Sequence, residues 1–154
     1  MIVPNDILFS NVKDAIREGK DVKIVAKGSS MLPFIRTGDT VVLTKPHRLR
    51  TGMIVLVEPQ DGIYILHRIV KLMENDMFLY GDGNLGNKEL VPYSSVIAVV
   101  KMVKRGKKEI NYNSLLWKLS NKLWPRNKFL RKYTLKLYRK TQKFSKFVST
   151  SSEN

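Results

Sequence analysis

A serine in a glycine-led segment is the first side chain of this sequence that could take part in chemistry. Ser30 lies in the segment GSSMLP, two residues after Gly28. A serine hydroxyl becomes a nucleophile only when a neighbouring base accepts its proton. Gly28 permits a close backbone approach, so Gly28 and Ser30 are candidates for backbone support of an oxyanion. The alternative is that Ser29 or Ser30 only caps the turn that follows.

A base is the second requirement, and the sequence contains 2 histidines. His47 stands among basic residues in a loop-like segment, where a solvated side chain is expected. His67 lies within the apolar stretch IYILHRIV, in which strand alternation places it on one face with Ile65 and Ile69 and places Arg68 on the other. His67 is therefore either a general base tuned by partial burial or a histidine of the core.

An acidic residue that could orient such a base occurs in the segment YGDGN. Asp82 stands there between Gly81 and Gly83. A carboxylate held against an imidazole fixes the tautomer that accepts a serine proton. Aspartate between glycines is also ordinary turn chemistry. The sequence leaves both alternatives open for Asp82.

The segments around these residues predict a mainly β domain preceded by a short helix. Apolar positions from Asp6 to Arg17 have helical spacing, and Gly19 stands where that helix would end. Val- and Ile-rich segments follow, separated by turn residues, of which Asp61-Gly62 is the clearest hairpin sequence. The predicted antiparallel strands are Val22–Ala26, Thr40–Leu43, Met53–Val57, Ile63–Val70, Met77–Tyr80 and Val96–Val103.

The charge of the chain is concentrated in its last third. Of 154 residues, 43% are hydrophobic and 27% are charged, as in globular proteins, and the formal net charge is +15. Residues 1–100 hold 12 basic and 11 acidic side chains, a net of +1, whereas residues 101–154 hold 16 and 2, a net of +14. The composition predicts a near-neutral β domain at 1–105, a basic helical extension at 106–148 and a disordered tail at 149–154.

Two amphipathic helices are predicted in this extension, separated by Pro125. Their apolar stripes contain Leu116, Leu119 and Leu123 in the first helix, and Leu130, Tyr133, Leu137 and Phe144 in the second. Tryptophan and tyrosine side chains favour a membrane interface, and this extension contains Trp117, Trp124, Tyr133 and Tyr138. In order of preference, the stripes pack on the β domain or another subunit, they bind a membrane surface, or the basic residues bind nucleic acid.

Composition excludes several classes of protein. The sequence has no cysteine, which excludes a disulfide framework, a thiolate zinc site and a cysteine nucleophile. Its first residues lack the apolar core of a secretion signal, and its longest aliphatic runs have 5 residues, against about 20 needed to span a bilayer. We therefore expect residence in the cytoplasm, at the membrane surface if the basic helices bind there. No metal or organic cofactor is expected.

The order of the motifs resembles that of the signal peptidase and LexA superfamily of serine peptidases. The segment GSSMLP, the pair Gly38-Asp39, the strand at 52–57, and the segments LHRIV and GDGN follow one another as in that superfamily, over about residues 22–103. The base in these enzymes is usually lysine, and a histidine base is similar to the signal peptidases of the endoplasmic reticulum and of archaea. The resemblance implies a coiled, barrel-like antiparallel β fold.

By the same resemblance, Ser30 matches the nucleophile, His67 the base and Asp82 the supporting acid. Three features differ from the family pattern. A soluble-looking helix stands where signal peptidases have a transmembrane tether. The side-chain oxyanion donor of many bacterial enzymes falls on Gly28, so backbone N–H groups, including that of Ser30, would have to serve. The histidine-type enzymes commonly have a second acidic residue soon after the GDGN segment, whereas this sequence continues with Asn87 and Lys88. Glu89, which follows them, is the candidate for that second acid.

We therefore expect a serine endopeptidase that processes a peptide or protein, with an extended substrate beside a strand edge and small side chains near the cut. A different class of function is a non-catalytic binding or assembly module on the same β scaffold. A repressor-type regulator is the least favoured alternative, because only about 20 residues precede the first predicted strand.

Overall fold

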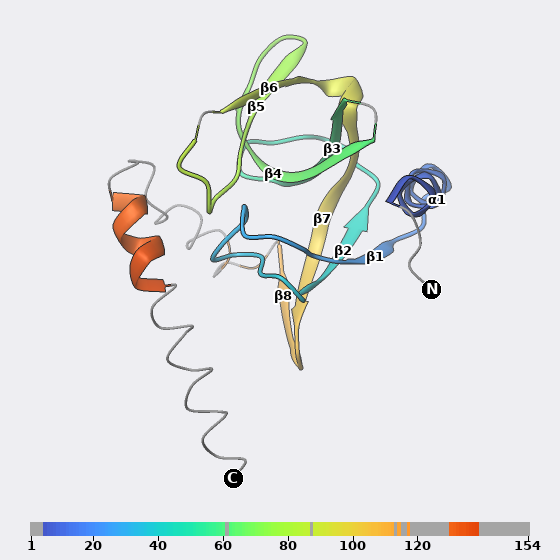
Figure 1. Ribbon diagram of the computed structural model, residues 1–154. Coiled ribbons are helices and arrows are strands. Elements are labelled where there is room, and N and C mark those ends of the chain that lie inside the picture. Colours follow the sequence, from blue (N-terminus) through green and yellow to red (C-terminus); the bar gives the residue numbers. More distant parts are fainter. Residues whose placement is uncertain are drawn as a thin grey trace.

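The computed structural model describes residues 5–60, 62–86, 88–112, 114, 117 and 130–138 (Figure 1). Within these ranges a helix is followed by eight strands and a 3-10 turn, and residues 130–138 form a further helix. In chain order the elements are α1 (Asn5–Arg17), β1 (Val22–Val25), β2 (Thr40–Thr44), β3 (Ile54–Gln60), β4 (Ile63–Leu72), β5 (Asp76–Tyr80), β6 (Glu89–Pro92), η1 (Tyr93–Ser95), β7 (Val96–Arg105) and β8 (Lys108–Asn111).

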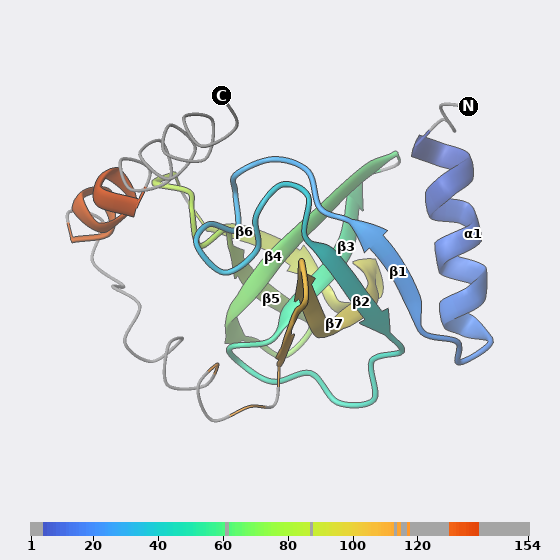
Figure 2. The same ribbon diagram turned by 90° about the horizontal axis from the view of Figure 1, so that it is seen from below.

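The strands form one antiparallel sheet in the order β1-β2-β7-β3-β4-β5-β6, with β8 paired to β7. The register shifts in four of its strand pairs, for example between Val42 and Leu43 where β2 meets β7 and between Ile69 and Lys71 where β4 meets β5. Such irregularities increase the local twist of a sheet. The sheet is accordingly coiled but not closed, and its path ends at β1 and β6 (Figures 1 and 2).

Strand β3 is apolar on both faces because the coiled sheet encloses two clusters. Ile54 and Leu56 belong to the cluster that also contains Val12 and Ile16 of α1. The alternate residues of β3, Val55 and Val57, belong to a second cluster. The members of the second cluster that are buried are Val55, Val57, Ile69, Met77, Leu79 and Val91. An uninterrupted run of branched apolar residues is what a strand buried on both sides requires.

The predicted fold class is confirmed: a mainly β, coiled antiparallel domain with a short N-terminal helix and a C-terminal helix. Two strands were not predicted. β6 carries a glutamate and a proline, which are rare in strands, and β8 consists largely of charged and polar residues. β8 also lies inside the extension predicted to be helical. It is a strand because the chain turns at Gly106 and returns antiparallel to β7.

Trp117, an aromatic residue of a kind that favours a membrane interface, packs in the protein. It is 4% exposed and packs edge-on against Phe34, with ring centroids 5.4 Å apart, and against Tyr112. Residues 118–129 and 139–154 lie outside the described part of the chain, and with them the predicted stripe positions Leu119, Leu123 and Phe144, and also Trp124, Pro125 and the tail at 149–154. Leu116 lies outside it as well. No helix in the described ranges is long and apolar enough to cross a membrane.

Candidate active site

Ser30 lies in the loop that joins β1 to β2. The loop begins as a continuation of the β1–β2 pairing, since the Ala26 amide donates to the Asp39 carbonyl at 2.9 Å. It then turns tightly, with the Leu32 N–H donating to the Ser29 carbonyl, and it is anchored by the buried side chains of Met31, Phe34 and Ile35. Ser30 itself is half-buried, whereas Ser29 is exposed.

The Asp39 carboxylate links the Ser30 loop to β7. It is 4% exposed and accepts hydrogen bonds from the Arg36 amide at 2.8 Å and from two nitrogens of Arg105. This contact raises the pKa of Arg105 above its usual value. The Gly38-Asp39 pair therefore serves to hold the Ser30 loop on β7, and its role is positional.

Gly81 and Gly83 let the loop after β5 pack directly on the Ser30 turn. A side chain at Gly83 would place its Cβ 2.2 Å from the Ser29 carbonyl oxygen, which no residue with a side chain could tolerate without a backbone shift. A Cβ at Gly81 would lie 2.7 Å from the Ser30 carbonyl oxygen and 2.9 Å from Nε2 of His67. The Gly83 amide also donates to the Ser30 carbonyl at 2.7 Å. The glycines are therefore needed for close approach.

The imidazole of His67 is held from the other side by a carboxylate. His67 is 4% exposed, and its Nδ1 lies 3.1 Å from Oε2 of Glu89, the first residue of β6. An imidazole in contact with a carboxylate donates its Nδ1–H to it, which leaves Nε2 as a proton acceptor. Nε2 is the nitrogen that faces Gly81 and the Ser30 backbone. This is the tautomer that a general base for a serine requires.

A buried ion pair lies on the opposite face of β4. Asp82, 2% exposed, accepts hydrogen bonds of 2.9 and 3.0 Å from Nε of Arg68 and one of 2.5 Å from Nη2. Nη1 of Arg68 donates to the Gly52 carbonyl at 2.7 Å, and the guanidinium lies over the Phe34 ring of the Ser30 loop, 4.9 Å from its centroid. The Tyr112 hydroxyl donates to the same Gly52 carbonyl.

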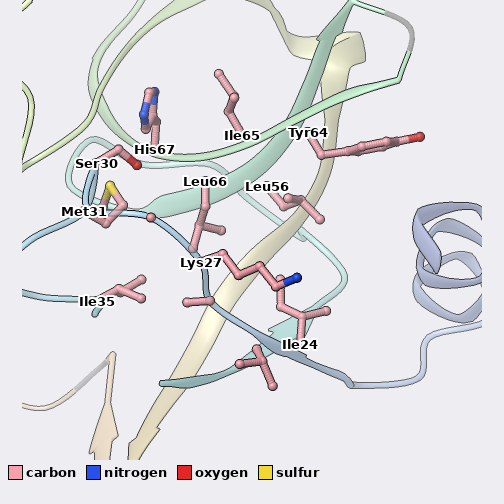
Figure 3. Close-up of a pocket in the computed structure, with 13 residues that line it drawn as sticks. Ile24, Lys27, Ser30, Met31, Ile35, Leu56, Tyr64, Ile65, Leu66 and His67 are labelled. Carbon is pink, nitrogen blue, oxygen red and sulfur yellow. The ribbon is translucent and has the colours of Figure 1, made fainter. Parts of the chain in front are cut away.

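A cleft of about 300 Å³ opens beside Ser30 and His67 (Figure 3). Ser30 and His67 lie beside each other at one end of it, with Ile65 and His67 rising from one side of β4 and Leu66 from the other. One wall is the continuation of β1 from Ile24 to Gly28, and the other consists of residues of β3 and β4. The walls are mainly apolar, and their side chains include Ile24, Ala26, Met31, Ile35, Leu56 and Leu66.

The strand β1 has only one neighbour, β2, so its second edge is unpaired by any described strand. Ala26 directs both its N–H and its C=O toward β2, the latter accepting from Gly38. Because backbone groups alternate along an antiparallel strand, those of Val25 and Lys27 point the other way. Val25 is 62% exposed, and both residues line the cleft. The free edge of a strand thus forms part of the cleft wall.

The structure brings three of the candidate site residues, Gly28, Ser30 and His67, to one cleft. It differs from the prediction on the carboxylates: the contact with the imidazole comes from Glu89, the secondary candidate, whereas Asp82 binds Arg68. Arg68 lies on the other face of the strand from His67, as alternation predicts, and it is only 8% exposed. His47 is exposed, as expected for a loop histidine.

Comparison with known proteins shows the family of the chain. A search of curated proteins gives no match to the chain. A family model described as Peptidase S24-like matches residues 5–103, a span that includes α1, the Ser30 loop, His67, both carboxylates and most of β7. The model covers well over half of the sequence, and the family falls within the superfamily of serine-peptidase-type hydrolases that contains LexA and signal peptidase I. The chain belongs to the Peptidase S24-like family.

Proposed function

We propose that the protein is a serine endopeptidase that uses Ser30 as nucleophile and His67 as general base. The observation that carries the proposal is the hydrogen bond from His67 to Glu89, which leaves Nε2 as the acceptor on the side of Ser30. A histidine of the protein core needs only hydrogen-bond partners for its ring nitrogens. Here the second nitrogen instead faces Gly81, next to the Ser30 backbone, and both Ser30 and His67 line an open cleft.

The reaction follows from this arrangement. Nε2 of His67 accepts the Ser30 proton while Oγ attacks the peptide carbonyl, and Glu89 stabilises the imidazolium that forms. Backbone N–H groups of the Gly28–Ser30 segment stabilise the oxyanion of the tetrahedral intermediate. The imidazolium then protonates the leaving amine, and water hydrolyses the acyl-enzyme by the same steps in reverse order. Asp82 acts through Arg68, as a positioning residue for the loop that packs on the Ser30 turn.

The proposed substrate is an extended peptide that lies along the unpaired edge of β1. It would pair with the backbone groups of Val25 and Lys27, as in β-augmentation. The apolar cleft walls favour small or apolar side chains next to the scissile bond. Processing in the manner of the histidine-type signal peptidases fits these requirements.

A serine-directed acylating probe tests the nucleophile. The parent protein should be labelled, and Ser30→Ala and His67→Ala should each abolish labelling and all cleavage of peptide libraries. Ser29→Ala is the matched control, because that serine precedes the nucleophile directly and is exposed. It should retain labelling. Full labelling of Ser30→Ala would refute the proposal, and peptide binding by an unlabelled parent protein would favour the binding module instead.

A further inference from the structure

The helix at 130–138 presents two different faces. Its inner face contains Arg131 and Leu135, which are 7% and 2% exposed, together with the half-buried Tyr138. Leu130, Tyr133 and Leu137 lie on the outer face and are 59%, 69% and 66% exposed. The stripe at Leu130, Tyr133 and Leu137 therefore does not pack on the β domain, which was one of the two arrangements, with packing on another subunit, in the preferred sequence interpretation.

Aromatic and cationic side chains hold the inner face in place. The Arg131 guanidinium lies 4.4 Å from the centroid of the Tyr80 ring, at the end of β5. The Tyr138 ring lies 5.0 Å from the guanidinium carbon of Arg36, in the Ser30 loop. Figures 1 and 2 both place the helix on the side of the molecule opposite α1, beside the loop that follows β5. The orientation of the outer face is thus fixed relative to the β domain.

The outer stripe is bordered by exposed cations. Residues three and four apart share one side of a helix, so Leu130, Tyr133 and Leu137 form a continuous apolar row. Lys132 and Lys136 are exposed and follow the same helix alongside that row. The surrounding sequence strengthens this charge, since residues 101–154 carry 16 basic and 2 acidic side chains.

We propose that this outer face binds the surface of an anionic lipid bilayer, with the helix in the plane of the interface. Leucine and tyrosine side chains enter the boundary between headgroups and acyl chains, and neighbouring lysines contact anionic headgroups. The β domain lies behind the inner face, so its cleft stays in water.

The charge pattern argues against two other occupants. A second copy of the chain would bring two strongly cationic extensions together around a short apolar row, and their repulsion opposes association. A nucleic acid backbone is recognised by cations and gains nothing from three exposed apolar side chains in a row. Only a surface that is both anionic and apolar uses the whole face.

Vesicle flotation of the full chain tests the proposal. The parent should bind vesicles containing half phosphatidylglycerol and half phosphatidylcholine, and binding to pure phosphatidylcholine should be at least about tenfold weaker, because each lysine near an anionic surface adds to affinity. Replacing Leu130, Tyr133 and Leu137 by Gln should weaken binding to the anionic vesicles by at least about tenfold, because the buried apolar area is lost. Lys132→Gln with Lys136→Gln should also weaken it, by about tenfold.

Two comparisons make the outcome specific. The double variant Ile63→Gln with Met73→Gln removes two exposed apolar side chains from the β domain, which are 47% and 45% exposed. It should leave vesicle binding unchanged. Binding to duplex DNA should be unaffected by the three Gln replacements in the stripe. Anionic vesicles bound equally well by that variant and by the parent would overturn the proposal, as would a parallel loss of DNA binding.

Discussion

Two carboxylates lie on either side of β4, and they differ in burial and in what they hold. Asp82 is almost fully enclosed and binds Arg68 through three hydrogen bonds. Glu89 has a side chain that is 45% exposed and makes one hydrogen bond, to His67. The two partners are consecutive residues of one strand, and alternation sends them to opposite faces of the sheet. Strand β4 therefore carries both the buried Arg68, which binds Asp82, and His67, the proposed base.

The difference in burial separates structural from chemical roles. A fully buried ion pair costs desolvation energy and is retained only with complete hydrogen bonding, which suits a contact that must never open. A carboxylate half in water can orient an imidazole and stabilise its charged form while remaining able to adjust as the charge changes. We therefore expect loss of Asp82 to act on stability and loss of Glu89 to act on turnover.

The largest effect is expected for Asp82→Ala. It leaves the Arg68 guanidinium buried without its carboxylate, which should lower the free energy of unfolding by about 3–5 kcal/mol. Urea unfolding followed by circular dichroism measures this. The double variant Arg68→Met with Asp82→Leu should recover much of the loss, because no charge is left buried. A loss below about 1 kcal/mol for Asp82→Ala would contradict the structural role.

Glu89→Gln is expected to leave stability nearly unchanged and to lower kcat about a hundredfold, with little change in KM. The amide keeps the shape of the side chain but does not stabilise an imidazolium. Cleavage kinetics on any substrate found for the parent would measure the split. Glu109→Gln is the matched control, since Glu109 is also a half-exposed carboxylate bound to one side chain, that of Lys104, but lies on β8. Equal effects of the two variants would remove Glu89 from the site.

Gly83→Ala sharpens the comparison by disturbing the support of the site without touching its charges. The added Cβ would meet the Ser29 carbonyl oxygen at 2.2 Å, so the loop must move away from the Ser30 turn. We expect a loss of about 1–3 kcal/mol in stability, as for other overpacked sites, together with reduced probe labelling. Gly86→Ala, where a Cβ meets nothing within 4 Å, should match the parent in both measurements.

Most of the fold could be predicted from the sequence because its strands are rich in Val and Ile and its turns contain glycine. β6 could not, because Glu89 and Pro92 are poor strand formers and their pairing with β5 depends on the whole sheet. That omission had a consequence for the site. Without β6, the sequence does not place Glu89 across β5 from His67, and the resemblance assigns the supporting acid to Asp82 of the GDGN motif.

The outer and inner faces of the helix at 130–138 illustrate a second limit. Apolar periodicity predicts that Leu130, Tyr133 and Leu137 face the protein. The structure instead buries Arg131 against Tyr80 and leaves the stripe exposed. An arginine can cover an aromatic ring with its planar guanidinium, so charge alone does not decide which face is buried. Ser30 and His67, by contrast, are predicted from local motifs, and both line the cleft.

The smallest effect is expected at Tyr112, which tests how dry the Arg68 side of β4 is. Burial raises the pKa of Tyr112 to about 12, from its usual value near 10. The unfolded chain therefore ionises this tyrosine first, and its contribution to stability is complete below pH 10 and is lost as the pH rises toward 12. Tyr112→Phe should cost about 1 kcal/mol at neutral pH, because the hydrogen bond to the Gly52 carbonyl is lost. The difference in free energy of unfolding between parent and variant, measured by urea unfolding, should then shrink above pH 10. A difference that stays constant with pH would mean that water reaches the Tyr112 hydroxyl. This face of β4 would then be no drier than the face that carries Glu89.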